Sequence, residues 1–183
     1  MTQPTPLPFG IRDIKLTGYT DLTATVLAGA SVDLPNARTL TFAETEDFEE
    51  LRGDDRVVAS HGNGPGVEWE LESGGVPFEA INLMYGATLA ETGIAPNRIK
   101  TLHKLVTQQR PYFKIEGQSI SDNGGDVHAI IYRAKCSDNL VGEFTDGAFF
   151  LAGASGVGLP SLVAATVDRI WSFVQNETAT AIP

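Results

Sequence analysis

Few residues of this chain have the types and spacing that chemistry requires. The segment from Gly153 to Ser161 has two glycines spaced as in a phosphate-binding loop, but Leu159 stands where lysine would contact phosphate. Pro160 follows, where a hydroxyl would hold magnesium. The three histidines are scattered, and the only cysteine, Cys136, lacks metal-ligand spacing. The sequence therefore predicts no enzyme, no cofactor and no metal site.

The charge of the chain also limits its functions. Thirteen Lys and Arg residues oppose 23 Asp and Glu residues, which gives a formal net charge of −10 at pH 7. Such a balance disfavours specific binding to nucleic acid, which needs clustered cations. Residues 147–167 carry no charge, but glycines and Pro160 interrupt them, so we expect no membrane span. We expect function to reside in surfaces of a soluble protein.

One stretch, from Gly66 to Gly86, has a clear change of hydrophobic period. It begins with apolar residues that alternate with glutamates, the period that places them on opposite faces of a strand. The acidic face carries three carboxylates: Glu68, Glu70 and Glu72. Pro77 then suits the first position of a helix, and Gly86 suits its end. The sequence predicts a half-buried strand followed by a short helix over residues 76–86.

A second strand is predicted to have a basic face. Its cations recur at even positions: Arg98, Lys100 and Lys104. No acidic residue occurs between Glu91 and Glu116, so this strand is a natural partner for the acidic row. Two interpretations remain open. The rows pair within one subunit, or the glutamates face a space where negative potential is useful and the basic row lies at an interface between subunits.

The densest charge lies between residues 44 and 55. This segment contains seven carboxylates: Glu44, Glu46, Asp47, Glu49, Glu50, Asp54 and Asp55. A run this acidic predicts an exposed loop. A strand is expected from Arg56 to Ser60, followed by a turn over residues 62–65.

The remaining elements are predicted to be β-strands. They are expected over residues 11–17, 23–28, 38–43, 112–118 and 127–135, with another pair over 140–145 and 149–152. Residues 166–177 fit a strand or a helix, and we favour a strand. The fold class is therefore mainly β, a mostly antiparallel sandwich or half-barrel with one short flanking helix. We expect one domain over residues 1–183, with an extended arm at 1–10 and a tail at 176–183.

As an ordered set, several segments resemble the major tail protein of actinobacterial siphophages. They are LRGDDRVVAS, GVEWELESGG with the helix closing on LMYG, RPYFKIEGQSISDNGGDVHAIIYRAK, FTDGAFFLAGASG and VQNETA. The resemblance covers the chain from about Leu51 to its end and is less clear before that residue. It implies a subunit of the tail tube, in a superfamily to which the tube protein of type VI secretion is also similar.

The resemblance implies a structural protein of the virion tail, assembled in the host cytoplasm. Subunits would form hexameric rings, with their sheets merged into one barrel, and the rings would stack into a tube. The implied partners are further copies of the chain, the tape measure protein, and the tail terminator and tail tip proteins. Viral DNA would pass through without specific binding.

In that setting, Glu68, Glu70 and Glu72 become candidates for facing the channel, where carboxylates would repel phosphate and help DNA to pass. Arg98, Lys100 and Lys104 become candidates for an interface. The acidic segment over residues 44–55 becomes a candidate for reaching the neighbouring ring, and both chain ends become candidates for contacts between subunits.

Two other functions remain open. The tube of a contractile injection or secretion system would have the same fold and the same rings. A monomeric β-barrel that binds a small apolar ligand would instead have an internal cavity lined by the scattered aromatic residues.

Overall fold

A computed structural model describes residues 5–141 and 143–183. Within these residues it contains one α-helix, α1 (Phe78–Tyr85), and a short 3-10 turn at Ala164–Thr166. The strands are β1 (Asp13–Tyr19), β2 (Leu27–Asp33), β3 (Ala37–Gly53), β4 (Arg56–Gly74), β5 (Thr88–Thr92), β6 (Ile99–His103), β7 (Phe113–Ile120), β8 (Asp126–Cys136), β9 (Leu151–Leu159) and β10 (Trp171–Asn176). The predicted mainly β class with one helix is confirmed.

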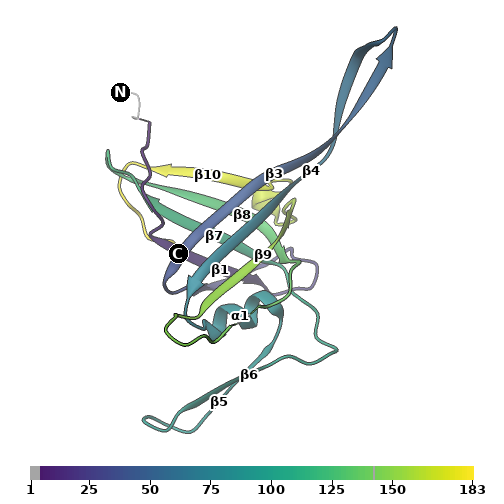
Figure 1. Ribbon diagram of the computed structural model, residues 1–183. Coiled ribbons are helices and arrows are strands. Elements are labelled where there is room, and N and C mark those ends of the chain that lie inside the picture. Colours follow the sequence, from purple (N-terminus) through teal and green to yellow (C-terminus); the bar gives the residue numbers. More distant parts are fainter. Residues whose placement is uncertain (1–4, 142) are drawn as a thin grey trace.

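The strands form one large antiparallel sheet that divides at β8. Its order is β2-β1-β7-β8-β9-β4-β3, and β10 also pairs with β8. Residues 126–131 of β8 pair with β10, whereas residues 133–136 pair with β9. Because two different strands share one edge of β8, the sheet separates into two layers. Figure 1 shows β3, β4 and β9 crossing over the layer that holds β1, β7 and β10.

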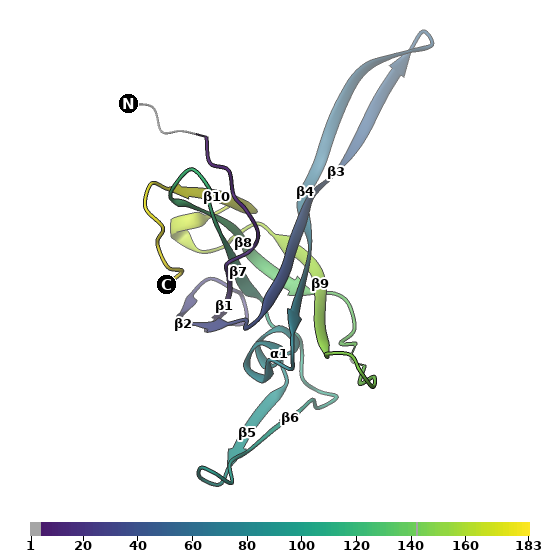
Figure 2. The same cartoon turned by 60° about the vertical axis from the view of Figure 1, so that its left-hand side comes forward.

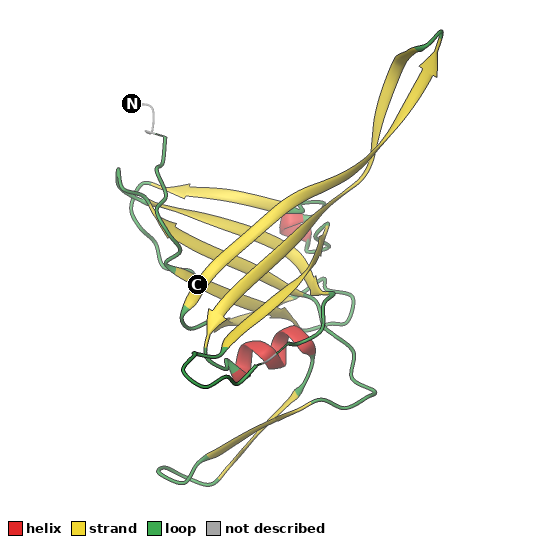
Figure 3. Cartoon of the chain, in the orientation of Figure 1, coloured by secondary structure: helices red, strands yellow, loops and turns green. Residues whose placement is uncertain are grey.

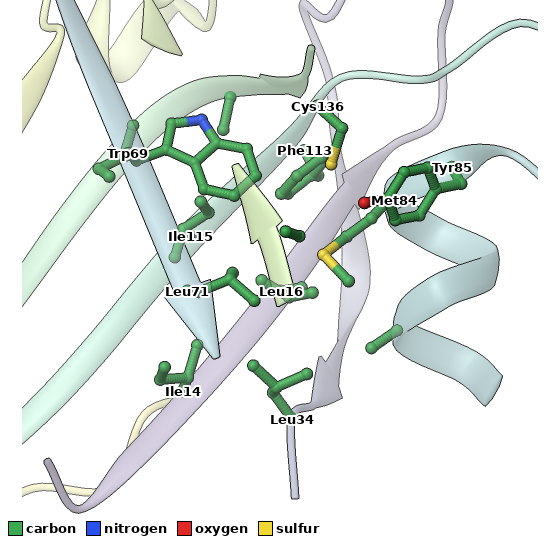
Figure 4. Close-up of a cluster of buried hydrophobic side chains, with 14 of the residues drawn as sticks. Ile14, Leu16, Leu34, Trp69, Leu71, Met84, Tyr85, Phe113, Ile115 and Cys136 are labelled. Atoms are coloured by element: carbon green, nitrogen blue, oxygen red, sulfur yellow. The ribbon is translucent and has the colours of Figure 1, made fainter. Parts of the chain in front are cut away.

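The space between the layers is filled by apolar side chains. Leu40 of β3 lies over Gly117 of β7, and the ring of Phe42 lies 5.6 Å from that of Phe173 in β10. Trp69 of β4 meets Phe113 of β7 edge to face at 5.7 Å (Figure 4). These contacts describe a sandwich whose core is completed by residues from β1, β8 and α1.

Helix α1 covers one end of this core. Ile81 and Met84 are buried in the core cluster. Pro77, predicted as the first helical residue, instead lies one position before the helix, which begins at Phe78. Gly86 ends the helix with a φ of 63°, a left-handed conformation that favours glycine. A Cβ atom at Gly86 would lie 2.2 Å from the carbonyl oxygen of Gln109, so the close passage of that segment also requires glycine.

Two β-hairpins project from the body in different directions. The outer part of the β3–β4 hairpin extends far beyond the sandwich, and the β5–β6 arm leaves from the opposite end (Figures 1 and 2). Figure 3 shows that the hairpin is strand along almost its whole length. The molecule therefore has an elongated shape with a compact centre.

Four predictions about local structure were wrong. The strand expected over residues 23–28 is absent from most of that range, because residues 21–26 contain turns and bends and β2 begins only at Leu27. The acidic segment over residues 44–55 is not a loop, because β3 continues to Gly53 and only Asp54 and Asp55 form a turn. Residues 62–65 are not a turn but part of β4. Residues 140–145 and 149–152 do not pair, since the described residues between Ser137 and Phe150 contain no strand. By contrast, the predicted strands at 112–118, 127–135 and 166–177 are confirmed as β7, β8 and β10.

Candidate assembly surfaces

The acidic row lies on the outer face of β4. Val67, Trp69 and Leu71 point into the core, so the alternating glutamates point away from it. Glu68 and Glu70 are exposed and take part in no ion pair within the described residues. Glu72 lies 3.2 Å from Arg38 of β3, an exposed pair that contributes about 1 kcal/mol at most. The row therefore presents a largely uncompensated negative face.

The neighbours of this row are small or uncharged. On β3 the residues opposite Glu70 and Glu68 are Thr41 and Ala43. On β9 they are Ser155 and Val157. None of these four flanking side chains is long enough to cover the carboxylates. The acidic face is not flat, because a hollow of about 460 Å³ lies over Glu68 and Glu70, and Asp138 adds a further carboxylate to its wall.

The interpretation that pairs the acidic row with the basic row inside one subunit was wrong. Of the basic row, Lys100 lies on β6, and Arg98 and Lys104 adjoin the two ends of this strand. The partner strand of β6 is β5. Lys100 forms ion pairs with Glu79 of α1 and, at 3.2 Å, with Glu91 of β5. Lys104 donates to the carbonyl oxygen of Tyr85 at 2.5 Å and so binds the C-terminal end of the helix. These lysines attach the β5–β6 arm to the body, which leaves Arg98, 3.9 Å from Glu91, as the weakly paired member.

The outer part of the β3–β4 hairpin combines negative charge with exposed apolar side chains. Of its seven carboxylates, only Glu50 has an ion-pair partner in the described residues, the neighbouring Arg52. Four of its apolar side chains are between 47% and 64% exposed: Phe48, Leu51, Val57 and Val58. A two-stranded ribbon is marginally stable on its own in water. A ribbon with four exposed apolar side chains therefore indicates a surface that another molecule contacts.

Several strands have a free edge. β2 pairs only with β1, β10 only with β8, and β3 only with β4, as far as the described residues extend. The unpaired amide and carbonyl groups of such edges can accept a strand from another chain. The sandwich thus has backbone surfaces suited to edge-to-edge association.

A buried polar cluster holds the C-terminal tail, and sequence reasoning missed it. The Nδ1 atom of His128 lies 2.9 Å from a Glu116 oxygen, and its Nε2 atom lies 3.0 Å from an Asp126 oxygen. The backbone amide of Thr180 donates to Asp126 at 2.9 Å. Gln118 donates to the Thr180 carbonyl oxygen at 3.0 Å. The tail, which the sequence suggested for contacts between subunits, is bound to its own sheet.

The two ends of the chain lie on neighbouring parts of the fold. The side chain of Ile182 is buried, and its carbonyl oxygen accepts from Lys15 of β1 at 2.5 Å. In the predicted N-terminal arm, residues 1–4 lie outside the described part. The amide of Phe9 donates to the carbonyl oxygen of Ile120 at 3.0 Å, so the rest of this arm follows the end of β7.

Burial and hydrogen bonding compete in setting the pKa values of the cluster. Burial raises the pKa of the Asp126 carboxyl, but hydrogen bonds from Gln118, Thr180 and other donors outweigh it and lower that pKa to about 2. Burial also disfavours the charged form of His128 and so lowers its pKa. The hydrogen bonds of His128 to Glu116 and Asp126 outweigh this effect and raise the pKa overall. Because each ring nitrogen of His128 faces a carboxylate oxygen, the cluster favours the imidazolium form of this side chain.

We expect this cluster to limit stability on both sides of a pH optimum. Asp126 has a lowered pKa, so its contribution is present above its ordinary value of 3.8 and disappears as pH falls through about 2. His128 has a raised pKa, so its contribution is complete below 6.5 and disappears as pH rises through the folded-state value. Urea unfolding from pH 5 to 9 should show stability falling with pH. The decline should be smaller in His128→Gln, and equal slopes for the two proteins would contradict the assignment.

Comparison with known proteins identifies no relative. A scan against protein-family models found no match, and a search of curated proteins found none either. Within residues 5–141 and 143–183, no three His, Cys, Asp or Glu side chains are placed to hold a metal ion. The same residues include no helix that is both long and apolar enough to cross a membrane.

Proposed function

We propose that this chain is the structural subunit of a tube that assembles from stacked hexameric rings, the tail tube of a long-tailed phage. The observation that carries the proposal is the β3–β4 hairpin. It extends from a folded core with uncovered apolar side chains and unpaired carboxylates, features that a monomer would not need. A second copy that covers this ribbon explains both.

The sandwich supports the same proposal. Free edges on β3 and β10 would let the sheets of neighbouring copies join around a ring. The acidic face of β3, β4 and β9 would then line the channel. Carboxylates there would repel DNA phosphates, and the nearby cation Arg38 is already paired with Glu72. In this proposal DNA is ejected through the tube, and the partners are the tape measure, tail terminator and tail tip proteins.

Electron microscopy of the purified protein over a range of concentrations tests this function. We expect rings or tubes with a central hole, and a three-dimensional reconstruction should place Glu68, Glu70 and Glu72 on the wall of the channel. A protein that stays monomeric at every concentration, even with preformed tube ends added as nuclei, would contradict the proposal. Glutamates on the outer wall would contradict the proposed lining alone.

One observation favours a small-ligand barrel as the alternative. A hollow of about 370 Å³ lies beside β3 and is lined mainly by apolar groups, among them Leu40, Ala129 and Phe173. A volume of that size suits a small apolar ligand. This function predicts a monomer that binds an apolar fluorescent probe with a defined stoichiometry. The tube predicts that any such binding decreases on assembly, because the hollow adjoins the free edge of β3.

A further inference from the structure

A second hollow lies at the end of the body from which the β5–β6 arm leaves. It has a volume of about 260 Å³ and lies between α1, β6 and the loop that follows β8. Four residues give it an apolar lining: Ile81, Tyr85, Leu102 and Leu140. Ala87, His103 and two cations, Lys104 and Arg110, complete its wall. A space of this kind can hold one or two apolar side chains whose neighbours carry negative charge.

The two cations of this hollow are not neutralised. Lys104 donates to the carbonyl oxygens of Tyr85 and Gly86. Arg110 donates to the carbonyl oxygen of Cys136 at 3.2 Å, and its guanidinium lies 5.3 Å from the centre of the Tyr85 ring. Among the described residues neither forms an ion pair with a carboxylate. Both cations are therefore fixed in place by neutral groups, and their positive charge remains available to a partner.

The tip of the β3–β4 hairpin has the complementary chemistry. Leu51 and Val57 lie next to the turn and are 64% and 47% exposed. Asp54 and Asp55 form the turn itself, and neither has an ion-pair partner within the described part of the chain. Two arginines flank this turn: Arg52, which binds Glu50, and Arg56. Over residues 44–58 seven carboxylates outnumber these two cations, so the end of the hairpin presents apolar side chains within a net negative charge, as the hollow requires.

The positions of the two surfaces rule out their meeting within one molecule. The hairpin and the arm leave from opposite ends of the body (Figures 1 and 2). A contact between them joins two different patches, one from each copy, and such a contact repeats indefinitely along an axis. We infer that the hollow between α1, β6 and the loop after β8 receives the hairpin tip of a second copy in the next ring. This inference rests on the proposed tube and names the surface at which its rings meet.

A charge placed in the hollow provides the first test. Leu140 is 47% exposed, so Leu140→Glu should fold normally while it neutralises the cations and repels the acidic tip. We expect it to need a roughly tenfold or higher protein concentration for half-maximal tube assembly. Leu22→Glu, which adds the same charge at a side chain that is 97% exposed and does not line the hollow, should assemble normally.

Disulfide trapping provides a second test that does not depend on a loss of assembly. Cys136 is buried, and burial raises the pKa of its thiol to about 12, so it gives little background reaction. Oxidation of assembled Leu51→Cys/Leu140→Cys protein should give a covalent ladder of many copies. Leu51→Cys/Leu22→Cys should give no ladder.

The results of these tests distinguish a failure of this inference from a failure of the proposed tube function. Absence of tubes from the unaltered protein overturns both. Normal tubes from the unaltered protein, with normal assembly of Leu140→Glu or no ladder from the Leu51→Cys/Leu140→Cys pair, overturn the inference and leave the tube intact.

Discussion

Replacement of residues 48–62 by an Asn-Gly turn should give a folded protein that forms no tubes. Asp47 and Asn63 are paired across the hairpin, so an Asn-Gly turn can close the two shortened strands. No residue between them belongs to the buried core cluster, which is why the sandwich should keep its stability. The exposed apolar side chains would be lost together with Glu49, Glu50, Asp54 and Asp55. We therefore expect complete loss of assembly, a far larger effect than any single substitution on the hairpin would have.

Sedimentation velocity and electron microscopy, at concentrations where the unaltered protein is fully assembled, would measure this effect. Urea unfolding provides the control, because an unchanged midpoint would show that the core survives. Tubes of ordinary length from the shortened chain would contradict the role assigned to the hairpin.

The second large effect is expected in the core. Phe113 is fully buried and lies edge to face against Trp69, at the point where β4 crosses β7 (Figure 4). Phe113→Ala should lower the free energy of unfolding by about 3 to 5 kcal/mol, since it removes a large ring and leaves a cavity between the layers. That is a large part of the stability of a typical domain.

Phe149→Ala is the matched control for this substitution. Its ring is 95% exposed, so the same change should alter the stability of the monomer by about 0.5 kcal/mol or less. Urea unfolding of both variants measures the comparison. Similar losses in the two would mean that the core does not depend on the contact between Trp69 and Phe113.

Local sequence patterns predicted a structural feature well where that feature depends on a single chain segment. The alternation of Trp69 and Leu71 with glutamates identified the inner and outer faces of β4, because side-chain direction follows directly from strand geometry. Pro77 and Gly86 located the helix because both residues act on their own backbone angles. These predictions needed no knowledge of the neighbouring strands.

Predictions that depended on partners failed or stayed open. One of the two interpretations left open paired the basic row with the acidic row on β4, but Lys100 binds Glu79 and Glu91, which are nearer in the chain and in space. The charge pattern alone cannot give the register that decides between such partners. His128 was similarly treated as isolated, although the pairing of Gln118 with His128 across β7 and β8 places the cluster on one face.

The hairpin was misjudged for a different reason. A dense run of carboxylates is typical of loops, because their mutual repulsion disfavours compact structure. The backbone of β3 nevertheless pairs with β4 from Ala37 to Gly53. At about 3.4 Å per residue the charges are distributed along an extended ribbon in water, where repulsion is weak. Composition indicated exposure correctly but did not distinguish an exposed strand from an exposed loop.

The order of the strands also determines when each part of the molecule can fold. β3 and β4 adjoin in sequence and need only the turn at Asp54 and Asp55, a local closure that hairpins complete within microseconds. β1 must instead wait for β7, and β4 for β9, because Asp13 pairs with Gln118 and Glu72 with Gly153. Contacts so distant along the chain slow folding. During synthesis the ribbon can therefore form while the sandwich that carries it is still incomplete.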